Sequence, residues 1–187
     1  MKFAMIAALA AASLAASANA AEVQGPWIEA RAGWDHIPGD GEIGSINGLL
    51  YGAAVGYDFK IGGSGFLGLQ AGISGSTGEI CFDGACAGAG RDIEILARAG
   101  VSVAERTSIH ALAGYANSRA AASFEGFDIG ANSDGLRLGA GVEQGFGKNL
   151  YSKLEYRFTT YASDEIEGFE VDGGNRHQVS VSFGVRF

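Results

Sequence analysis

The sequence predicts an all-β fold, an eight-stranded antiparallel up-and-down β-barrel that spans a membrane, and three observations support this. Eight segments alternate apolar residues with small or polar ones at the period of two typical of a β-strand. Each segment is close to the ~9–11 residues that a tilted strand needs to cross a bilayer. The connections between the segments are alternately long and short, which is typical of barrels whose two ends face different compartments.

The eight segments share one pattern, an apolar face opposite a face of mostly small, polar or charged residues. In chain order they cover 27–35, 49–59, 66–77, 92–103, 108–117, 135–146, 151–161 and 178–187. Their apolar faces begin at Ile28, Leu49, Leu67, Ile93, Ile109, Leu136, Leu154 and Val179 and continue at every second residue. The last segment is the most regular, because Val179, Val181, Phe183, Val185 and the terminal Phe187 all lie on one face.

The connections indicate which ends of the strands lie together. Four are long and polar, at 36–48, 78–91, 118–134 and 162–175. Three are short, at 60–65, 104–107 and 147–150. Outer-membrane barrels have long loops outside the cell and short turns in the periplasm. An even number of strands then places both ends of the barrel domain on the short-turn side.

The composition of the two faces indicates that the apolar face points outward, to lipid. The opposite face is rich in glycine, which suits the narrow lumen of an eight-stranded barrel. Outward aromatic residues also collect near the strand ends, as in the girdles of membrane barrels. They are Trp34, Tyr51 and Tyr115 at the long-loop end, and Tyr57, Phe59, Phe146 and Phe187 at the short-turn end. A soluble barrel of the lipocalin type or a β-sandwich, with its apolar face inside, is the alternative.

The first residues of the chain predict an export signal that is removed. Met1-Lys2 is positively charged, residues 3–18 are apolar, and Ala18-Asn19-Ala20 is a small-x-small cleavage site. We expect residues 1–20 to be a signal peptide and residues 21–187 the barrel domain, with cleavage after Ala21 as the alternative. Loss of Lys2 changes the net charge from −8 to −9, which disfavours nucleic acid as a partner. The predicted location is the outer membrane of a Gram-negative bacterium.

The predicted barrel resembles the small outer-membrane barrels of the OmpA/OmpX and opacity-protein type. The resemblance rests on Trp27-Ile-Glu-Ala-Arg-Ala-Gly-Trp34, Tyr51-Gly-Ala-Ala-Val-Gly-Tyr57, Leu138-Gly-Ala-Gly-Val-Glu143, Lys153-Leu-Glu-Tyr-Arg-Phe158 and the terminal Phe187. It implies the fold more than any activity, and it implies that Phe187 is part of the signal read by the outer-membrane assembly machinery. We expect a monomer whose partners are outer-membrane lipid, lipopolysaccharide, that machinery and an unidentified ligand at the extracellular loops.

The inward face carries twelve charged residues of both signs. They are Glu29, Arg31, Asp35, Asp92, Glu94, Arg98, Arg137, Glu143, Lys153, Glu155, Arg157 and Arg186. Buried charges must be paired, because an isolated one costs several kcal/mol. The sequence therefore predicts an ion network that plugs the lumen, with Glu143 or Glu155 paired with Arg137 or Arg157. A small nonspecific porin, in which these charges line a channel, is the alternative.

Two cysteines in the second long connection predict a local disulfide. Cys81 and Cys86 belong to an exported chain, and Asp83-Gly84 favours a turn between them. Two cysteines are too few for a closed zinc site. The fourth connection is acidic, with Asp164, Glu165, Glu167, Glu170 and Asp172, but the spacing is not that of an EF-hand. We therefore expect no metal and no cofactor.

The sequence contains no specific catalytic motif, and we expect no enzyme. Its three histidines are His36, His110 and His177. His110 is predicted to lie in the lumen, and His177 with Ser163 and Asp164 would be the one Ser/His/acid set to consider. The predicted function is a structural or surface-interaction role in the cell envelope. A lipid A-modifying enzyme is the alternative after the porin.

Overall fold

Eleven strands form in the described part of the chain, which in this computed structural model is residues 23–39, 44–82, 85–124, 127–162, 164–166, 169–171 and 174–187. They are β1 (Gly25–Ile37), β2 (Ile46–Ile61), β3 (Gly65–Ser76), β4 (Glu79–Phe82), β5 (Ala85–Ala104), β6 (Thr107–Phe124), β7 (Phe127–Phe146), β8 (Leu150–Tyr161), β9 (Asp164–Ile166), β10 (Phe169–Val171) and β11 (Asn175–Arg186). The predicted signal peptide, residues 1–20, lies outside the described residues.

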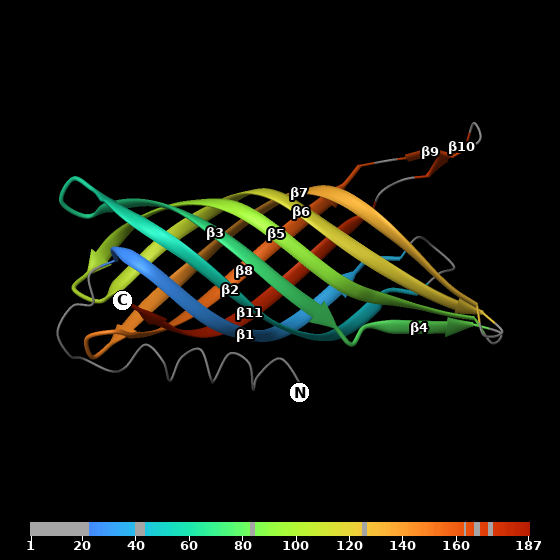
Figure 1. Ribbon diagram of the computed structural model, residues 1–187, viewed down its shortest axis with the longest axis horizontal. Helices are drawn as coiled ribbons and strands as arrows, with labels where there is room; N and C mark the ends of the chain where they lie inside the picture. Colours follow the sequence, from blue (N-terminus) through green and yellow to red (C-terminus); the bar gives the residue numbers. More distant parts are fainter. Residues whose placement is uncertain are drawn as a thin grey trace.

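Eight of these described strands close into an antiparallel barrel. β3, β2, β1, β11, β8, β7, β6 and β5 pair in that order, and pairing of β3 with β5 completes the cylinder. At the junction of the first and last strands, Ala30 on β1 lies opposite Phe183 on β11. Figure 1 shows the strands wrapping obliquely around the long axis. The predicted fold class, an eight-stranded antiparallel barrel, is confirmed.

The barrel is polar inside and apolar outside, as its composition predicts. Outward residues such as Ile95, Leu69 and Phe183 are about 60% exposed (61%, 59% and 60%). On the inward face, Arg137 and Thr159 are fully buried. Exposed apolar side chains form a continuous outer band, which is stable only in contact with lipid. The lipocalin-like alternative is therefore wrong.

Two of the predicted long loops are instead extensions of the barrel strands. The predicted loop 118–134 is largely the continued pairing of β6 with β7, from Ser118 opposite Ser133 to Phe124 opposite Phe127. Most of the predicted loop 78–91 pairs as β4 with β5. Beyond the membrane both faces of a strand are in water, so the alternation ends although the backbone pairing continues. Figure 1 shows these strands reaching well past the barrel, with the separate β9–β10 hairpin at the same end.

The opposite end of the barrel is closed by short turns, as predicted. Residues 62–64, 105–106 and 147–149 connect the strand pairs there. Gly62 and Gly147 both have a φ of 63°, a left-handed conformation that glycine adopts without steric cost. The C-terminus lies at this short-turn end (Figure 1). No helix in the described part of the chain is long and apolar enough to cross a membrane.

Candidate functional site in the barrel lumen

The lumen contains equal numbers of buried acidic and basic side chains among the described residues. The seven acids are Glu29, Asp35, Asp58, Asp92, Glu94, Glu143 and Glu155. The seven bases are Arg31, Arg98, Arg137, Lys153, Arg157, Arg176 and Arg186. All twelve charges that the sequence places inward are therefore buried, together with two more. The excess negative charge of the protein lies outside the lumen.

Four side chains form a closed ring near the short-turn end. Arg98 donates from Nη1 to Asp58 Oδ2 at 2.8 Å and from Nη2 to Glu143 Oε2 at 2.5 Å. Arg186 donates to the same two carboxylates, to Asp58 Oδ2 at 2.7 Å and to Glu143 Oε1 at 2.8 Å. Each guanidinium bridges both acids, so β2, β5, β7 and β11 are joined across the lumen.

The predicted pair of Glu143 or Glu155 with Arg137 or Arg157 forms at Glu155, which contacts Arg157, and not at Glu143. Glu143 pairs with Arg98 and Arg186, and not with Arg137 or Arg157. Arg137 lies six residues away on the same strand, and this spacing corresponds to about 20 Å. Pairing in the lumen depends on which strands face each other across the tilted barrel, and the alternation pattern does not contain that information.

A second group of charges occupies the middle of the lumen. Lys153 Nζ lies 2.7 Å from Glu29 Oε2 and 3.1 Å from Glu155 Oε1. Glu155 also contacts Arg157, two residues away on the same face of β8. His110 Nε2 is 2.9 Å from Glu155 Oε1, which assigns this histidine to the network. Every charged group here has an oppositely charged neighbour.

Glu94 connects the middle of the lumen to its outer part. Its Oε1 accepts a hydrogen bond from Arg31 at 2.6 Å, and its Oε2 accepts one from Arg137 at 2.6 Å. Arg157 Nη1 lies 3.6 Å from Glu94 Oε1. Three cations thus surround one carboxylate, and the network remains continuous toward the long-loop end.

Arg176 closes the network near the long-loop end. It donates to both carboxylate oxygens of Asp35 at 2.7 Å, and to Asp92 Oδ2 at 3.0 Å. Asp92 also accepts two hydrogen bonds from Arg137, at 2.8 and 2.7 Å. Arg176 was not predicted to enter the lumen, because it lies between the loop predicted to end at residue 175 and the strand predicted to begin at Gln178. Extending the inward-facing alternation of that strand by two residues, from Gln178 back to Arg176, would have identified it.

Two aromatic side chains, Tyr151 and Trp27, lie in the lumen beside the four paired charges near the short-turn end. Tyr151 lies over Gly184, where an added Cβ would be 2.3 Å from the tyrosine Cζ. Trp27 lies in the same way over Gly56, at 2.3 Å from such a Cβ. The Arg98 guanidinium is 5.6 Å from the centroid of the Trp27 ring, within cation–π range. The inward glycines therefore make room for aromatic rings, a role that the alternation of residues along a strand does not reveal.

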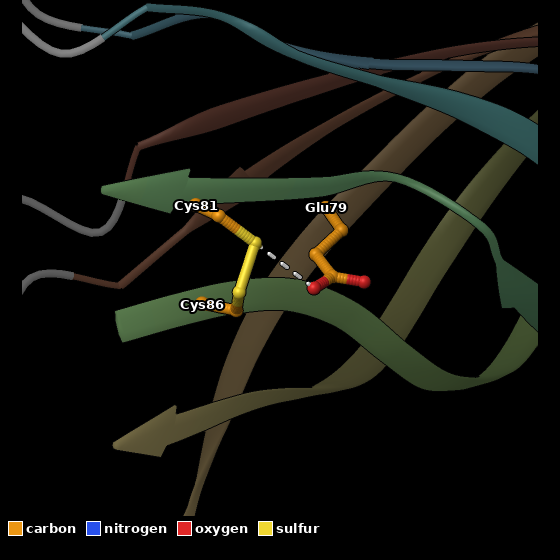
Figure 2. Close-up of side chains that lie close together, drawn as sticks. All are labelled: Glu79, Cys81 and Cys86. Atoms are coloured by element: carbon orange, nitrogen blue, oxygen red, sulfur yellow. Dashed lines mark hydrogen bonds between the residues drawn. A yellow bond between two sulfur atoms is a disulfide. The ribbon is translucent and has the colours of Figure 1, made fainter. Parts of the chain in front are cut away.

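The cysteines lie on the extended hairpin at the other end of the barrel. Cys81 on β4 faces Cys86 on β5, and the two sulfur atoms are bonded in a disulfide (Figure 2). A carboxylate oxygen of Glu79 lies 3.2 Å from Cys81 Sγ, a contact without a donated proton because a disulfide sulfur carries none. These three residues would otherwise suggest a metal site. Metal binding by cysteine requires the thiolate, so the disulfide does not support one.

The comparison with protein families identifies the chain. The model of the outer membrane protein β-barrel domain matches residues 4–187. The chain belongs to this family. Its location is therefore the outer membrane, where long connections face the outside and short turns the periplasm. Among curated protein sequences, none matches this chain.

Solved outer-membrane barrels share the fold with this chain. Neisserial surface protein A superposes with a TM-score of 0.64 at 16% identity, covering 87% of this chain and 97% of the other. Ail, the attachment invasion locus protein of Yersinia pestis, has a TM-score of 0.60 at 15% identity, covering 88% and 99%. The N-terminal barrel domain of Pseudomonas aeruginosa OprF has a TM-score of 0.51 at 15% identity, covering 88% and 98%. At these identities the likeness shows the fold alone.

Phe187 lies at the periplasmic rim of this family member. Its side chain is exposed, and its backbone N–H donates to the Pro26 carbonyl at 2.9 Å, beside the strand that closes the barrel. This is the place that the alternation of the last strand predicts for it. Its role as an assembly signal stays a prediction.

Two of the histidines lie at the outer end of the barrel. His36 Nδ1 is 2.9 Å from Asn47 Oδ1, and His177 Nδ1 is 2.7 Å from the Tyr156 hydroxyl. Ser163 lies outside the described residues, and the side chain of Asp164 is not described either. Of the candidate Ser/His/acid set, only the side chain of His177 belongs to the described residues. Its Nδ1 lies within hydrogen-bond distance of the Tyr156 hydroxyl.

Proposed function

We propose that this family member is a closed, non-conducting barrel that anchors extracellular hairpins at the cell surface, in a structural or surface-interaction role. The observation that carries the proposal is the balanced ion network of the lumen. Seven acids and seven bases are buried there and connected from Asp58 to Arg176. Such a network is stable only while its pairs stay intact, because breaking a buried pair leaves an uncompensated charge. It therefore acts as a plug.

The extended hairpins support the surface-interaction part of the proposal. β5, β6 and β7 continue past the membrane as paired strands, and the disulfide between Cys81 and Cys86 holds the neighbouring β4. A paired and cross-linked hairpin presents a defined surface, since its backbone is already ordered before any partner binds. The barrel supplies the anchor, and these hairpins supply the contact area.

The charge of the extracellular segments indicates which partners suit this surface. The segments 38–45, 77–91, 119–134 and 162–174 contain twelve acidic residues and two basic ones. The acids are Asp40, Glu42, Glu79, Asp83, Glu125, Asp128, Asp134, Asp164, Glu165, Glu167, Glu170 and Asp172. One structure of the Yersinia pestis barrel contains the heparin analogue sucrose octasulfate. For this chain a polyanion is disfavoured, and a basic protein surface or divalent cations would complement the charge.

A small pore is the second candidate function, and one observation favours it. The side-chain polar atoms of Gln178, Ser180 and Ser182 on β11 are buried and have no hydrogen-bond partner in the described residues. Such a polar stripe along one wall of a barrel suits water. Pairs of opposite charge lie along the rest of the lumen, which supports the closed barrel over the pore.

A catalytic role receives less support than either. His110 is 5% exposed and is bonded to Glu155 inside the network, where a lipid substrate has no access. We propose that the protein does not modify lipid A. Lipid A from cells with and without the gene should then give the same mass spectrum, and a difference of one acyl chain would support the enzyme instead.

The surface role is tested by separating the barrel from its hairpins. In one variant, residues 79–89 and 119–131 are replaced by short Gly-Asn turns, while the lumen is left intact. Wild-type cells should bind a labelled basic protein, and cells that express this variant should keep a folded outer-membrane barrel and lose that binding. A matched variant, Lys148→Ala in a periplasmic turn, should bind like wild type. Equal binding by cells with the shortened hairpins would contradict the proposal.

A further inference from the structure

Two histidines meet on the outer wall, where the first and last strands of the barrel pair. His36 on β1 lies directly opposite His177 on β11, in the pair of that ladder nearest the long-loop end. Both continue the outward alternation of their strands, next to Trp34 and Val179, and both are half-exposed. The centroids of the two imidazole rings are 6.1 Å apart. Two side chains of the commonest metal-binding type therefore lie side by side at the outer rim.

A hydrogen bond at Nδ1 fixes the orientation of His36. Its Nδ1 lies 2.9 Å from Asn47 Oδ1. The amide nitrogen of Asn47 donates to Ser45 instead, to Oγ at 3.3 Å and to the carbonyl oxygen at 3.4 Å, so Oδ1 accepts from His36 Nδ1–H. The other ring nitrogen, Nε2, then carries the lone pair. Metal-binding histidines are commonly held in this way, by an oxygen that accepts a hydrogen bond from the second ring nitrogen.

His177 can present the same nitrogen. Its Nδ1 is 2.7 Å from the Tyr156 hydroxyl, a group that either donates or accepts a hydrogen bond. When the hydroxyl accepts from Nδ1–H, the lone pair of His177 is at Nε2. Within the described part of the chain, neither Nε2 has a hydrogen-bond partner. Two imidazole lone pairs on neighbouring strands are thus available to an electron-pair acceptor.

The spacing of the rings suits a shared transition-metal ion. With metal–nitrogen bonds of ~2.0–2.1 Å, two imidazoles at the tetrahedral angle have centroids about 5 Å apart. A movement of about 1 Å brings the two rings from the observed 6.1 Å to that spacing. Zn²⁺, Cu²⁺ and Ni²⁺ favour imidazole nitrogen, whereas Ca²⁺ and Mg²⁺ favour oxygen ligands. The pair of rings therefore selects the first group of ions.

The charge of the neighbouring segments favours a cation. Segment 38–45 follows His36, and segment 162–174 comes shortly before His177. In sequence they contain seven acidic residues and no basic one, namely Asp40, Glu42, Asp164, Glu165, Glu167, Glu170 and Asp172. A concentration of negative charge raises the local concentration of cations and the rate at which they arrive. These acids act through their charge and are not assigned as ligands.

We propose that His36 and His177 bind one divalent transition-metal ion, Zn²⁺ or Cu²⁺, which bridges β1 and β11 at the outer rim of the barrel. Because these are the first and last strands, the ion joins the two ends of the sheet. A ligand that binds the folded barrel alone also stabilises it. The inference is independent of whether the lumen conducts and of whether the extended hairpins bind a partner.

Trp34 supplies an optical probe for this site. Its ring stacks on that of His36, with centroids 5.2 Å apart and planes inclined by 13°. Bound Cu²⁺ quenches the fluorescence of an adjacent indole. The other tryptophan, Trp27, is buried in the lumen near the short-turn end and should keep its emission.

The test titrates Cu²⁺ into the full chain, refolded without an affinity tag in neutral detergent micelles. Wild type should lose part of its fluorescence at one equivalent of Cu²⁺, and excess Zn²⁺ should restore it. His36→Gln and His177→Gln, each shown by circular dichroism to be folded, should bind Cu²⁺ about tenfold or more weakly, since each loses one of two ligands. The control Asp134→Asn, which removes an exposed acid from the same end of the barrel, should bind like wild type.

Two further arms separate the histidine pair from the acidic segments. Millimolar Ca²⁺ should not restore the fluorescence, because it favours oxygen ligands. Zn²⁺ should raise the urea midpoint of wild type and leave that of His36→Gln/His177→Gln unchanged. Unchanged Cu²⁺ affinity of this double variant, or full displacement of Cu²⁺ by Ca²⁺, would overturn the proposal. Equal stabilisation of wild type and double variant by Zn²⁺ would overturn the bridge between β1 and β11.

Discussion

Arg98 and Arg186 donate hydrogen bonds to the same two carboxylates, although they lie on different strands and carry the same charge. Asp58 and Glu143 each stand between the two guanidinium groups, at 2.5 to 2.8 Å. Two positive charges are close together only because two negative charges separate them. The ring is neutral as a whole, and it joins strands that are not neighbours in the sheet.

The ring predicts a large loss of stability when one acid is neutralised. In Asp58→Asn, Arg98 and Arg186 keep Glu143 as their shared acid, and the ring acquires an uncompensated positive charge. We expect the free energy of unfolding to fall by about 3–5 kcal/mol, as for other broken buried pairs. Equilibrium urea unfolding of the protein in lipid vesicles measures this. Asp134→Asn, which changes an exposed outward acid bonded to Tyr115 and Asn117, should have a much smaller effect. Equal effects of the two substitutions would argue against the ring.

The packing of Tyr151 on Gly184 predicts that this glycine tolerates no side chain. Gly184→Ala would place a methyl group 2.3 Å from the tyrosine Cζ, so the ring must move away from its bond to Glu29. We expect a loss of about 1–3 kcal/mol, which is typical of overpacking. Gly63→Ala is the matched control, since an added Cβ there meets nothing within 4 Å. Urea unfolding that ranks the two alanine variants alike would contradict this packing.

The outward apolar band predicts a cost for charge that depends on depth in the membrane. Ile95 lies near the middle of the membrane-spanning part of β5, and Val103 lies next to the turn at residues 105–106. Arginine on the lipid-facing side costs about 2–4 kcal/mol at the midplane and about 0–1 kcal/mol near the interface. Unfolding in vesicles should therefore show a larger loss for Ile95→Arg than for Val103→Arg. In a soluble barrel, the loss of stability would not depend on the distance of the substituted residue from the strand end.

The disulfide predicts a local effect and not a global one. Cys81 and Cys86 belong to β4 and the outer end of β5, beyond the closed barrel. Cys81→Ser/Cys86→Ser should leave the urea midpoint of the barrel unchanged and make the extracellular hairpin more sensitive to protease. Limited proteolysis with mass spectrometry locates the cleavage. In the non-reduced wild type, titration with a thiol reagent should find no free cysteine, and two free thiols would contradict the bond.

The fold follows from the sequence because membrane and lumen impose opposite demands on alternate residues. Ile93 and Ile95 face lipid, so Asp92 and Glu94, which alternate with them, must face inward. The same rule fails outside the membrane, where water surrounds both faces. Residues 118–124 therefore have no alternation that predicts their pairing, although they continue β6.

The pairs inside the lumen depend on a property that the sequence pattern does not contain. Arg186 and Asp58 are separated by 128 positions, and they meet because the tilt of the strands brings the ends of β11 and β2 to the same level. The parity of each strand shows which residues enter the lumen. The shear of the closed barrel, which the alternation does not show, decides which of them form pairs.

The conductance of the purified protein in a planar lipid bilayer tests the closed lumen most directly. The full chain, refolded in detergent and inserted into a bilayer in 1 M KCl, should give no steady current steps, because paired side chains from Asp58 to Arg176 occupy the lumen. The Asp58→Asn variant, in which the ring at the periplasmic end is broken, should be noisier than wild type. Reproducible unitary steps from the wild type, with one value of conductance across many insertions, would contradict the plug and favour the small pore.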